Sequence, residues 1–347
     1  MTQSARKRRG SGRTTLHNVA ELAGVSAMTV SRYFSNKESV RLDMQQRIAA
    51  AIEQTGYVRN VFAGSLASAR GRCVGMVIPH IAGGVYEETI QAVTDTLRPF
   101  GYQLLLASSN YSTEEEEAAV RAFIGWAPAA LILTGQKRSR KTTELLANAG
   151  VPVVETWAHK TRPQHIQVGF SNPSVGKDST HYLYERGYRR IVFVHPPRTD
   201  DVGANDRASG YEAAMHELGL APATFRPQAT VLLDAGAEAF RTLTSGRTPA
   251  DALIFSNDNL AAGALLHGLR ERIAIAQTCA VMGFGDLSIA DKLVPSLTTV
   301  RPPRYEMGRI AALRVIELLR AIEEDAPTDA IERDNLLTYE IVERESA

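Results

Sequence analysis

The stretch Thr15–Arg32, TLHNVAELAGVSAMTVSR, decides how the N-terminal part of the chain folds. Its first half has the apolar spacing of one face of a short helix, at Leu16, Val19, Ala20 and Ala23. Gly24 follows at once, and glycine is the residue most often found just after a helix C-terminus. Ser26 is a favoured N-cap residue, so it predicts a second helix from Ala27 to about Phe34. Two short helices with a Gly-Val-Ser corner between them predict a helix-turn-helix module.

A third helix should complete this module. The pattern from about Leu42 to Thr55 places three apolar residues on one face, Ile48, Ala51 and Ile52, and Gly56 ends it. We therefore assign residues 14–59 to one small all-α domain. Residues 1–13 are basic, contain Gly and Ser, and lack apolar periodicity, which predicts a disordered arm.

The net charge of +1 conceals an uneven distribution along the chain. Residues 1–72 contain 12 Lys and Arg against 4 Asp and Glu, whereas the whole chain contains 39 and 38. The rest of the chain is therefore mildly acidic. A compact basic module ahead of an acidic body indicates that only the N-terminal part meets a polyanion such as nucleic acid.

From residue 73 onward, apolar strand-like runs alternate with amphipathic helical stretches. The predicted strands are Val74–Pro79, Leu104–Ser108, Ala129–Thr134, Val151–Trp157, Arg190–His195, Ala252–Asn257 and Ala280–Phe284. Buried, non-alternating strands with helical crossovers predict parallel sheets covered on both faces. There are more of them than one doubly wound sheet comfortably holds. The fold class is therefore α/β, with two lobes of parallel doubly wound sheets behind the all-α module.

We place the first lobe at about 73–170 and 301–330 and the second at about 171–300 and 331–347, with residues 60–72 as a linker. Ligands bind beyond the carboxyl ends of parallel strands, so two facing lobes predict a ligand cleft between them. The chain shows no leucine heptads after the strand-like run 336–342, which favours a dimer without a coiled-coil tail.

Two cysteines, Cys73 and Cys279, lie in apolar runs far apart in the sequence, which indicates core thiols rather than a disulfide or a metal pair. No apolar run approaches the roughly 20 residues of a membrane helix. No apolar segment follows the basic residues 6–9, as it would in a signal peptide. The sequence thus indicates a soluble, cytoplasmic protein with no metal, no cofactor and no membrane partner.

The run Thr15–Arg32 resembles the headpiece signature of the lactose-repressor (LacI/GalR) family. The resemblance extends to the chain's end through Gly56-Tyr57-Val58-Arg59-Asn60, Leu66-Ala67, Ser256-Asn257-Asp258, Gly283-Phe284-Gly285-Asp286 and Leu297-Thr298-Thr299-Val300. Within the family, Val153-Val154-Glu155 and Val168-Gly169-Phe170 look most like the gluconate-utilisation (GntR-like) repressors and the related 2-ketogluconate regulators. The resemblance implies a homodimeric transcriptional repressor that binds double-stranded operator DNA. It also implies a periplasmic-binding-protein-like domain that binds a small effector.

By this resemblance, the second helix enters the major groove, where only outward side chains can read base edges. The implied DNA contacts are Thr15, Leu16, Ser26, Ala27, Met28, Thr29, Ser31, Arg32, Tyr57, Asn60 and Leu66. Ala27 and Met28 are the variable specificity pair of the family. Ser26 can instead be simply a cap, and Met28 a core residue.

Residues 60–68 would form a hinge helix that is too short to be stable alone and orders only on DNA. The resemblance assigns Leu66 as the apolar wedge in a central base step. The chain departs from the family pattern at three places. Arg59 replaces the usual proline, Gly64 weakens the hinge helix, and Arg41 stands where a capping Ser or Thr normally opens the third helix.

The family pattern also implies which residues line the effector cleft. These are His80, Tyr86, Thr134, Glu155, Trp157, Arg207, Asp234, Asn257 and Asp286. The guanidinium of Arg207 can hold a carboxylate through two parallel hydrogen bonds, Asn257 can bind a hydroxyl, and Trp157 can cover an extended carbon chain. A linear sugar acid such as gluconate or 2-ketogluconate suits this set.

Simpler readings of these residues stay open. Arg207 can be an exposed residue at the start of a helix, and Asn257 can merely cap the helix after its strand. Alternation places Glu155 and Trp157 on one strand face, which could be buried packing. Many family members have a sugar-binding aspartate at the position of Gly285, and glycine lacks that side chain.

Other functional classes fit less well. The sequence contains no Gly-x-Ser-x-Gly, His-Glu-x-x-His or Cys-x-x-Cys motif, so an enzyme such as a sugar kinase is not expected. A periplasmic sugar-binding protein would have a similar body but no basic headpiece. A regulator that binds DNA only together with its ligand remains the alternative, because the sign depends on which lobe arrangement the ligand prefers.

Overall fold

The computed structural model describes residues 14–58, 71–135, 137–161 and 163–347. The chain forms two compact units, residues 1–69 and 70–347. The predicted arm and most of the predicted linker, with Arg59, Asn60, Gly64 and Leu66, lie outside the described residues.

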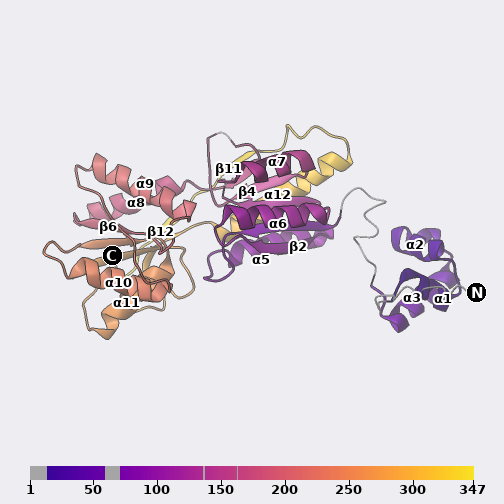
Figure 1. The fold of residues 1–347 in the computed structure, drawn as a ribbon, viewed down its shortest axis with the longest axis horizontal. Coiled ribbons are helices and arrows are strands. Elements are labelled where there is room, and N and C mark those ends of the chain that lie inside the picture. Colours follow the sequence, from indigo (N-terminus) through magenta and orange to yellow (C-terminus); the bar gives the residue numbers. More distant parts are fainter. Residues whose placement is uncertain (1–13, 59–70, 136, 162) are drawn as a thin grey trace, which may run out of the picture. The chain divides into compact units, whose positions relative to one another are not determined.

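The first unit contains the three predicted helices, α1 (Leu16–Ala23), α2 (Ala27–Ser35) and α3 (Leu42–Thr55), with a short 3₁₀ turn η1 (Lys37–Ser39) before α3 (Figure 1). Thr15 and Asn18 form a capping box, in which each backbone N–H donates to the other's side-chain oxygen. Gly24 ends α1 with a φ of +63°, a conformation that glycine adopts without strain. The buried core of this unit consists of Val19, Ala20, Ala23, Val30, Val40, Ile48 and Ala51.

The N-terminus of α3 differs from the other two helix starts. Arg41 makes no side-chain capping bond, in keeping with its unfavourable residue type at that position. α3 is held elsewhere, because Arg47 Nη2 donates to the carbonyl oxygen of Gly24 at 2.9 Å. This bond ties α3 to the corner between α1 and α2.

The described part of the second unit contains two six-stranded sheets. The first has the order β11-β5-β4-β3-β1-β2, and its described pairs are all parallel. Its strands are β1 (Cys73–Ile78), β2 (Gln103–Ser108), β3 (Ala130–Thr134), β4 (Val153–Thr156), β5 (Ile166–Gly169) and β11 (Asp334–Leu336). The second has the order β12-β10-β9-β8-β6-β7, in which only β12 is antiparallel. Its strands are β6 (Ile191–Val194), β7 (Ala223–Phe225), β8 (Ala252–Phe255), β9 (Ala280–Phe284), β10 (Thr298–Arg301) and β12 (Glu340–Val342).

Helices cover these sheets, as the apolar runs predict. The first sheet packs against α5 (Glu87–Leu97) with α12 (Arg304–Glu323), and against α6 (Thr113–Gly125), which packs on α7 (Arg140–Ala149). A 3₁₀ turn, η2 (Arg98–Phe100), follows α5. The second sheet carries the pairs α8 (Asn172–Glu185) with α9 (Val202–Glu217) and α10 (Leu232–Thr244) with α11 (Asp258–Arg270). Cys279 is buried and Cys73 half-buried, and both are free thiols.

The chain passes between the lobes after β5, after β10 and between β11 and β12. The sequence-based boundary was wrong at the last of these, because residues 331–347 do not all belong to the second lobe. β11 lies beside β5 in the first sheet, where buried Asn335 donates to the carbonyl of Gln167. β11 is an edge strand of mostly polar residues, so the sequence pattern did not predict it.

Helices α8 and α9 approach each other backbone to backbone. A Cβ on Gly176 would lie 1.8 Å from the carbonyl oxygen of Arg207, and one on Gly210 would lie 1.8 Å from that of Pro173. Only glycine permits this distance at both positions. The contact therefore fixes where the backbone of Arg207 sits.

Gly176→Ala should destabilise the second unit by about 2 kcal/mol, because the added methyl group forces the two helices apart. Gly125→Ala is the matched control. Gly125 also lies in a helix, but a Cβ there would meet nothing within 4 Å. It should be neutral or stabilise by about 0.5 kcal/mol. Calorimetric unfolding of the full chain measures both, and equal Tm values for the two variants would contradict the close helix contact.

Candidate functional site

The outward face of α2 carries the side chains predicted to read DNA. Met28 is 70% exposed, and Ser31 and Arg32 are also exposed, while Val30 between them is fully buried. The core reading of Met28 is therefore wrong. Ala27 is half-buried at the first turn of α2. A flexible apolar side chain projecting from a helix suits contact with base edges and methyl groups.

The helix starts present exposed hydroxyl groups. Ser26 Oγ accepts the N–H of Thr29 at 3.1 Å and lies 2.8 Å from Thr29 Oγ1, so Ser26 does cap α2. Thr15 is exposed at the start of α1. Leu16 and Tyr57 are half-buried and pack on the core of this unit, with the ring of Tyr57 6.0 Å from that of Phe34. Helix N-termini with exposed hydroxyls are suited to phosphate oxygens.

The second unit contains a cleft of about 580 Å³ at the carboxyl ends of strands from both sheets. Six of the nine residues predicted to bind an effector line it: His80, Tyr86, Thr134, Trp157, Arg207 and Asn257. They lie at the end of β3, just after β1, β4 or β8, at the N-cap of α5, or in the first half of α9. This is the place where parallel α/β sheets bind ligands.

Arg207 is the most deeply set charged group of the cleft. It is 7% exposed, and Nη1 donates to Asn172 Oδ1 at 2.6 Å while Nη2 donates to the carbonyl of Ser256 at 2.9 Å. Its guanidinium lies 3.8 Å from the centroid of the Phe284 ring. Burial lowers the pKa of Arg207, although Asp201 and Asp206 nearby oppose the shift. The reading of Arg207 as an exposed residue is therefore wrong.

The cleft concentrates polar atoms that have no hydrogen-bond partner. Among the described residues, eight buried side-chain atoms lack a partner, and five of them belong to residues that line the cleft. These five are Glu116 Oε1, Thr134 Oγ1, Trp157 Nε1, Arg207 Nε and Ser256 Oγ. Buried polar groups are normally satisfied, so their clustering indicates a place where a polar ligand contributes the missing bonds.

Aromatic side chains form one wall of the cleft. The ring of Tyr86 meets that of Trp157 edge-on at 4.7 Å, and Trp157 meets Phe170 at 6.0 Å. Burial raises the pKa of Tyr86 and of Tyr111, so both phenols remain neutral donors at physiological pH. Trp157 and Tyr111 have φ values of +68° and +62°, an unusual strain for large side chains. Strained residues of this kind gather at functional sites.

Three of the predicted effector residues lie outside the cleft lining. Glu155 is buried and pairs with Arg138, with Nη1 2.6 Å from Oε1, so this side chain belongs to the packing of the first lobe. Burial raises the pKa of this carboxyl more than Arg138 lowers it. Asp234 is exposed in the first turn of α10. These two residues were predicted wrongly as lining residues.

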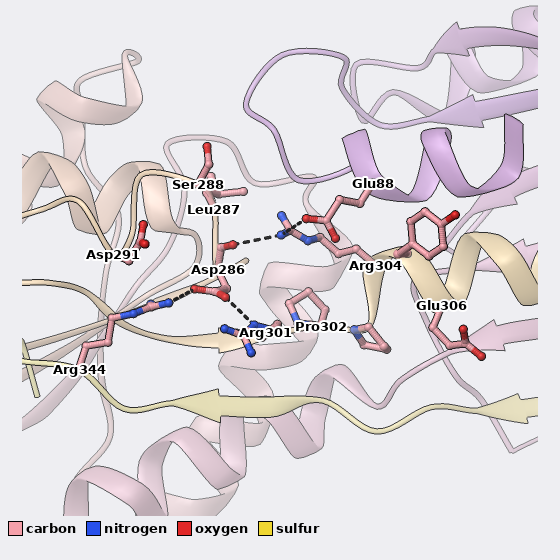
Figure 2. A pocket seen from close by; sticks show the side chains of 12 residues that line it. Glu88, Asp286, Leu287, Ser288, Asp291, Arg301, Pro302, Arg304, Glu306 and Arg344 are labelled. Atoms are coloured by element: carbon pink, nitrogen blue, oxygen red, sulfur yellow. Dashed lines mark hydrogen bonds and ion pairs between the residues drawn. The ribbon is translucent and has the colours of Figure 1, made fainter. Parts of the chain in front are cut away.

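Asp286, the third, lines a separate pocket of about 490 Å³ beside the crossing strand β10. Figure 2 shows its carboxylate between Arg301 and Arg344, which donate to its two oxygens at 2.6 and 2.7 Å. Arg304 donates to Glu88 and to the carbonyl of Asp286 on the other side. Because Arg301 and Arg344 bind both of its oxygens, this carboxylate is part of the second pocket and does not line the cleft.

The structure also adds cleft residues that the sequence reasoning missed. They include Tyr111, Asn172, Arg198, Asp201, Asp206 and Asn259. Asn172 follows β5, a short strand without a long apolar run. The sequence analysis did not predict β5, so it did not place Asn172 after a strand. Asp201 caps α9, with Oδ1 accepting the N–H of Ala204, and an Asp before a helix was a detectable signal.

Comparison with known proteins matches two segments of the chain. The family of bacterial regulatory proteins called the lacI family matches residues 15–60, and a periplasmic binding protein-like domain matches residues 180–347. The chain is 33% identical to the HTH-type transcriptional regulator GntR of Pseudomonas aeruginosa, over all of this chain and 99% of that one. The chain belongs to the LacI family.

Other members of the LacI family are similar over most of their length. The GntR regulator of Escherichia coli K12 is 31% identical over 89% of this chain and 92% of its own. A solved LacI-family structure from Silicibacter pomeroyi is 30% identical, with a TM-score of 0.88 over 96% of this chain and 99% of that one. These relatives are transcriptional regulators, so this LacI-family chain is a DNA-binding regulator and not an enzyme.

The described residues also bear on membranes and metal ions. None of their helices combines the length and apolar character needed to cross a membrane. Within the same residues, no three His, Cys, Asp or Glu side chains gather as they would around a metal ion.

A buried carboxylate joins the cleft to the pocket of Asp286. Asp258 follows the cleft residue Asn257, is fully buried, and accepts bonds from Thr299 Oγ1 at 2.6 Å and from Leu287 N at 2.8 Å. Burial raises the pKa of Asp258 to about 6. The folded LacI-family protein therefore holds this proton more tightly than the unfolded chain does.

Asp258→Asn should be more stable than the parent protein above pH 6, and the two should converge near pH 4. The unfolded carboxyl ionises first as the pH rises, so the stability from this group is lost between about pH 4 and 6 and amounts to at most about 3 kcal/mol. Asn keeps an acceptor for Leu287 and a partner for Thr299. Chemical unfolding at pH 4.5 and 7.5 tests this. Asp291→Asn, at an exposed position, is the control, and a less stable Asp258→Asn at pH 7.5 would contradict the assignment.

Proposed function

We propose that this protein is a sequence-specific transcriptional repressor whose operator binding is controlled by a small sugar acid, such as gluconate or 2-ketogluconate, acting as inducer. The observation that carries the proposal is Arg207. Its guanidinium is buried in the cleft without a carboxylate within ion-pair distance among the described residues. A buried charge without a direct ion-pair partner is costly unless a ligand neutralises it.

A carboxylate suits this position better than a neutral group does. Asn172 and Ser256 fix the two outer nitrogens of Arg207, and the ring of Phe284 fixes its plane. A guanidinium oriented in this way forms charge-assisted bonds to a planar carboxylate with little further ordering. The buried setting strengthens those bonds.

The rest of the cleft favours a chain of hydroxyl groups. Thr134 and Ser256 contribute hydroxyl oxygens without hydrogen-bond partners, and Asp206 adds a half-buried carboxylate that makes no hydrogen bond or ion pair among the described residues. Hydroxyls of a linear sugar acid can donate to such acceptors, while Trp157 covers the carbon chain. The resemblance of 153–155 and 168–170 to gluconate-utilisation repressors points to the same ligand class.

On DNA, we propose that α2 lies in the major groove of each half-site, with the protein as a homodimer in the cytoplasm. Ala27 and Met28 would read bases, and Thr15, Ser26, Thr29, Ser31 and Arg32 would contact phosphates or neighbouring base edges. Leu16 and Tyr57 would position the helices at the backbone. The roles of Asn60 and Leu66 in the minor groove remain proposals from the family resemblance.

A co-repressor mechanism is the second candidate. In it, the ligand would favour the lobe arrangement that binds DNA, so operator affinity would rise with ligand. Operator titrations with and without gluconate distinguish the two signs directly.

Replacing Ala27 and Met28 together, for example by Ala27→Gln and Met28→Ser, should change the preferred operator while leaving non-specific binding nearly intact. Met28 is exposed, and half-buried Ala27 touches the core only with its methyl group, so the exchange removes base contacts and little core packing. Selection from a randomised operator library measures the preference. Met28→Ala alone should leave Tm unchanged, and an equal loss of affinity for every sequence would show a structural role instead.

Arg207→Ala should weaken gluconate binding by about 2–4 kcal/mol, because it leaves a desolvated carboxylate without its charged partner. Arg207→Lys should recover only part of this, since a point charge cannot replace the planar fork. Operator binding without ligand should persist, which would make the Ala variant a repressor that its inducer cannot release. Isothermal titration of the three proteins decides it, and unchanged gluconate affinity in Arg207→Ala would remove the carboxylate clamp.

A further inference from the structure

A polar bridge joins the two lobes at the mouth of the cleft. Arg198, in the segment after β6 of the second sheet, lines the cleft and donates from Nη2 to the carbonyl oxygen of Asn110 at 2.6 Å. Its guanidinium also lies 4.2 Å from the centroid of the Tyr111 ring. Asn110 and Tyr111 follow β2 of the first sheet. One side chain of the second lobe thus holds both the backbone and a ring of the first.

Each side of this bridge is held in place by its own lobe. Asp200 binds the guanidinium of Arg198 with both carboxylate oxygens, at 2.6 and 3.0 Å, and Arg226 donates to the Arg198 carbonyl. Opposite, Asn110 and Tyr111 have φ values of +47° and +62°. That unusual backbone aims the Asn110 carbonyl and the Tyr111 ring toward the other lobe.

The bridge is also connected to the groups around the ligand position. Tyr111 and Tyr86 interact electrostatically, since each phenol affects the pKa of the other, and the ring of Tyr86 packs on Trp157. The charges of Arg207 and Asp201 act on both tyrosines. A displacement of Arg198 would therefore affect Tyr86 and Trp157 through one intermediate residue, Tyr111.

A second bond crosses the cleft elsewhere. Asn259 Nδ2, on α11 of the second lobe, donates to the carbonyl of Gly83 in the first lobe at 3.1 Å. This contact is neutral and has no stacked ring. A neutral hydrogen bond is weaker than a charge-assisted one that is combined with a cation–π contact.

We infer that Arg198 is a positioning residue that closes the cleft over the effector and slows its release. Arg198 acts through Tyr111 and Asn110 and needs no contact with the ligand itself. This inference rests on the proposed function for the ligand, but the bridge between the lobes is a property of the protein alone. Its action on the effector is on dissociation, because the bridge must open before a ligand leaves, whereas association occurs through the open arrangement.

Arg198→Ala should therefore raise the dissociation rate of gluconate about tenfold, the change expected from losing one charge-assisted bond and one stacked cation. The association rate should change by less than about twofold. Stopped-flow fluorescence of the full-length protein measures both, because Trp157 lies in the cleft. Arg198→Lys keeps the charge but not the planar fork and should give an intermediate rate.

Arg309→Ala is the matched control. Arg309 binds Glu306 with the same two-bond geometry, at 2.8 and 2.6 Å, on the outside of α12. It should leave both rates unchanged. Asn259→Ala, which removes the neutral bond, should raise the dissociation rate less than Arg198→Ala does.

Amide hydrogen exchange without any ligand tests the bridge separately. Arg198→Ala should speed exchange in residues 109–113, and Arg309→Ala should not. If the parent protein does not bind gluconate but the exchange difference is present, the proposed effector is wrong and the bridge stands. Unchanged hydrogen exchange in Arg198→Ala would overturn the inference. A loss of affinity that came more from slower association than from faster dissociation would overturn it as well.

Discussion

The backbone contact between α8 and α9 is the constraint on which the cleft depends. Gly176 and Gly210 let the two helices touch, and the touching point is the carbonyl of Arg207 itself. The side chain of Arg207 then has a single direction, toward Asn172 of α8 and the end of β8 at Ser256. Helices α8 and α9 and the end of β8 thus fix the position of one guanidinium before any ligand binds. Rigid placement of this kind is what makes an anion contact specific.

Pairing with arginine also determines which acidic side chains remain available to bind a ligand. Arg138 takes Glu155, and Arg301 with Arg344 takes Asp286, so these carboxylates stabilise the protein's own structure. Among the described residues, Asp206 makes no hydrogen bond or ion pair with an arginine, and it lines the cleft instead. Residues of the same chemical type therefore divide into structural and ligand-facing groups according to the arginines within reach, a distinction that depends on three-dimensional distances.

The sequence predicted the elements that have strong local signals. The three headpiece helices follow from their caps and apolar spacing, and strands such as β1, β3 and β9 follow from long apolar runs. The short strands β5, β7, β10 and β11 were missed, because three or four residues such as Asp-Asn-Leu carry no pattern until they pair. The cleft was predicted where a residue follows a recognised strand, as with Trp157 and Asn257. Tyr111 and Arg198 also follow recognised strands, but they were not predicted, because their roles depend on contacts between the lobes.

The interlaced path of the chain has a consequence for how the protein is made. The headpiece uses contacts between residues close in sequence, so it can fold while the rest is still being synthesised. Neither sheet of the second unit can gain its last strand before residues 334–342 leave the ribosome, because β11 completes one and β12 the other. Such a high contact order slows folding and leaves apolar strand edges exposed on the nascent chain. A cell therefore holds a folded DNA-reading module attached to an unfinished ligand-binding body until translation is nearly complete.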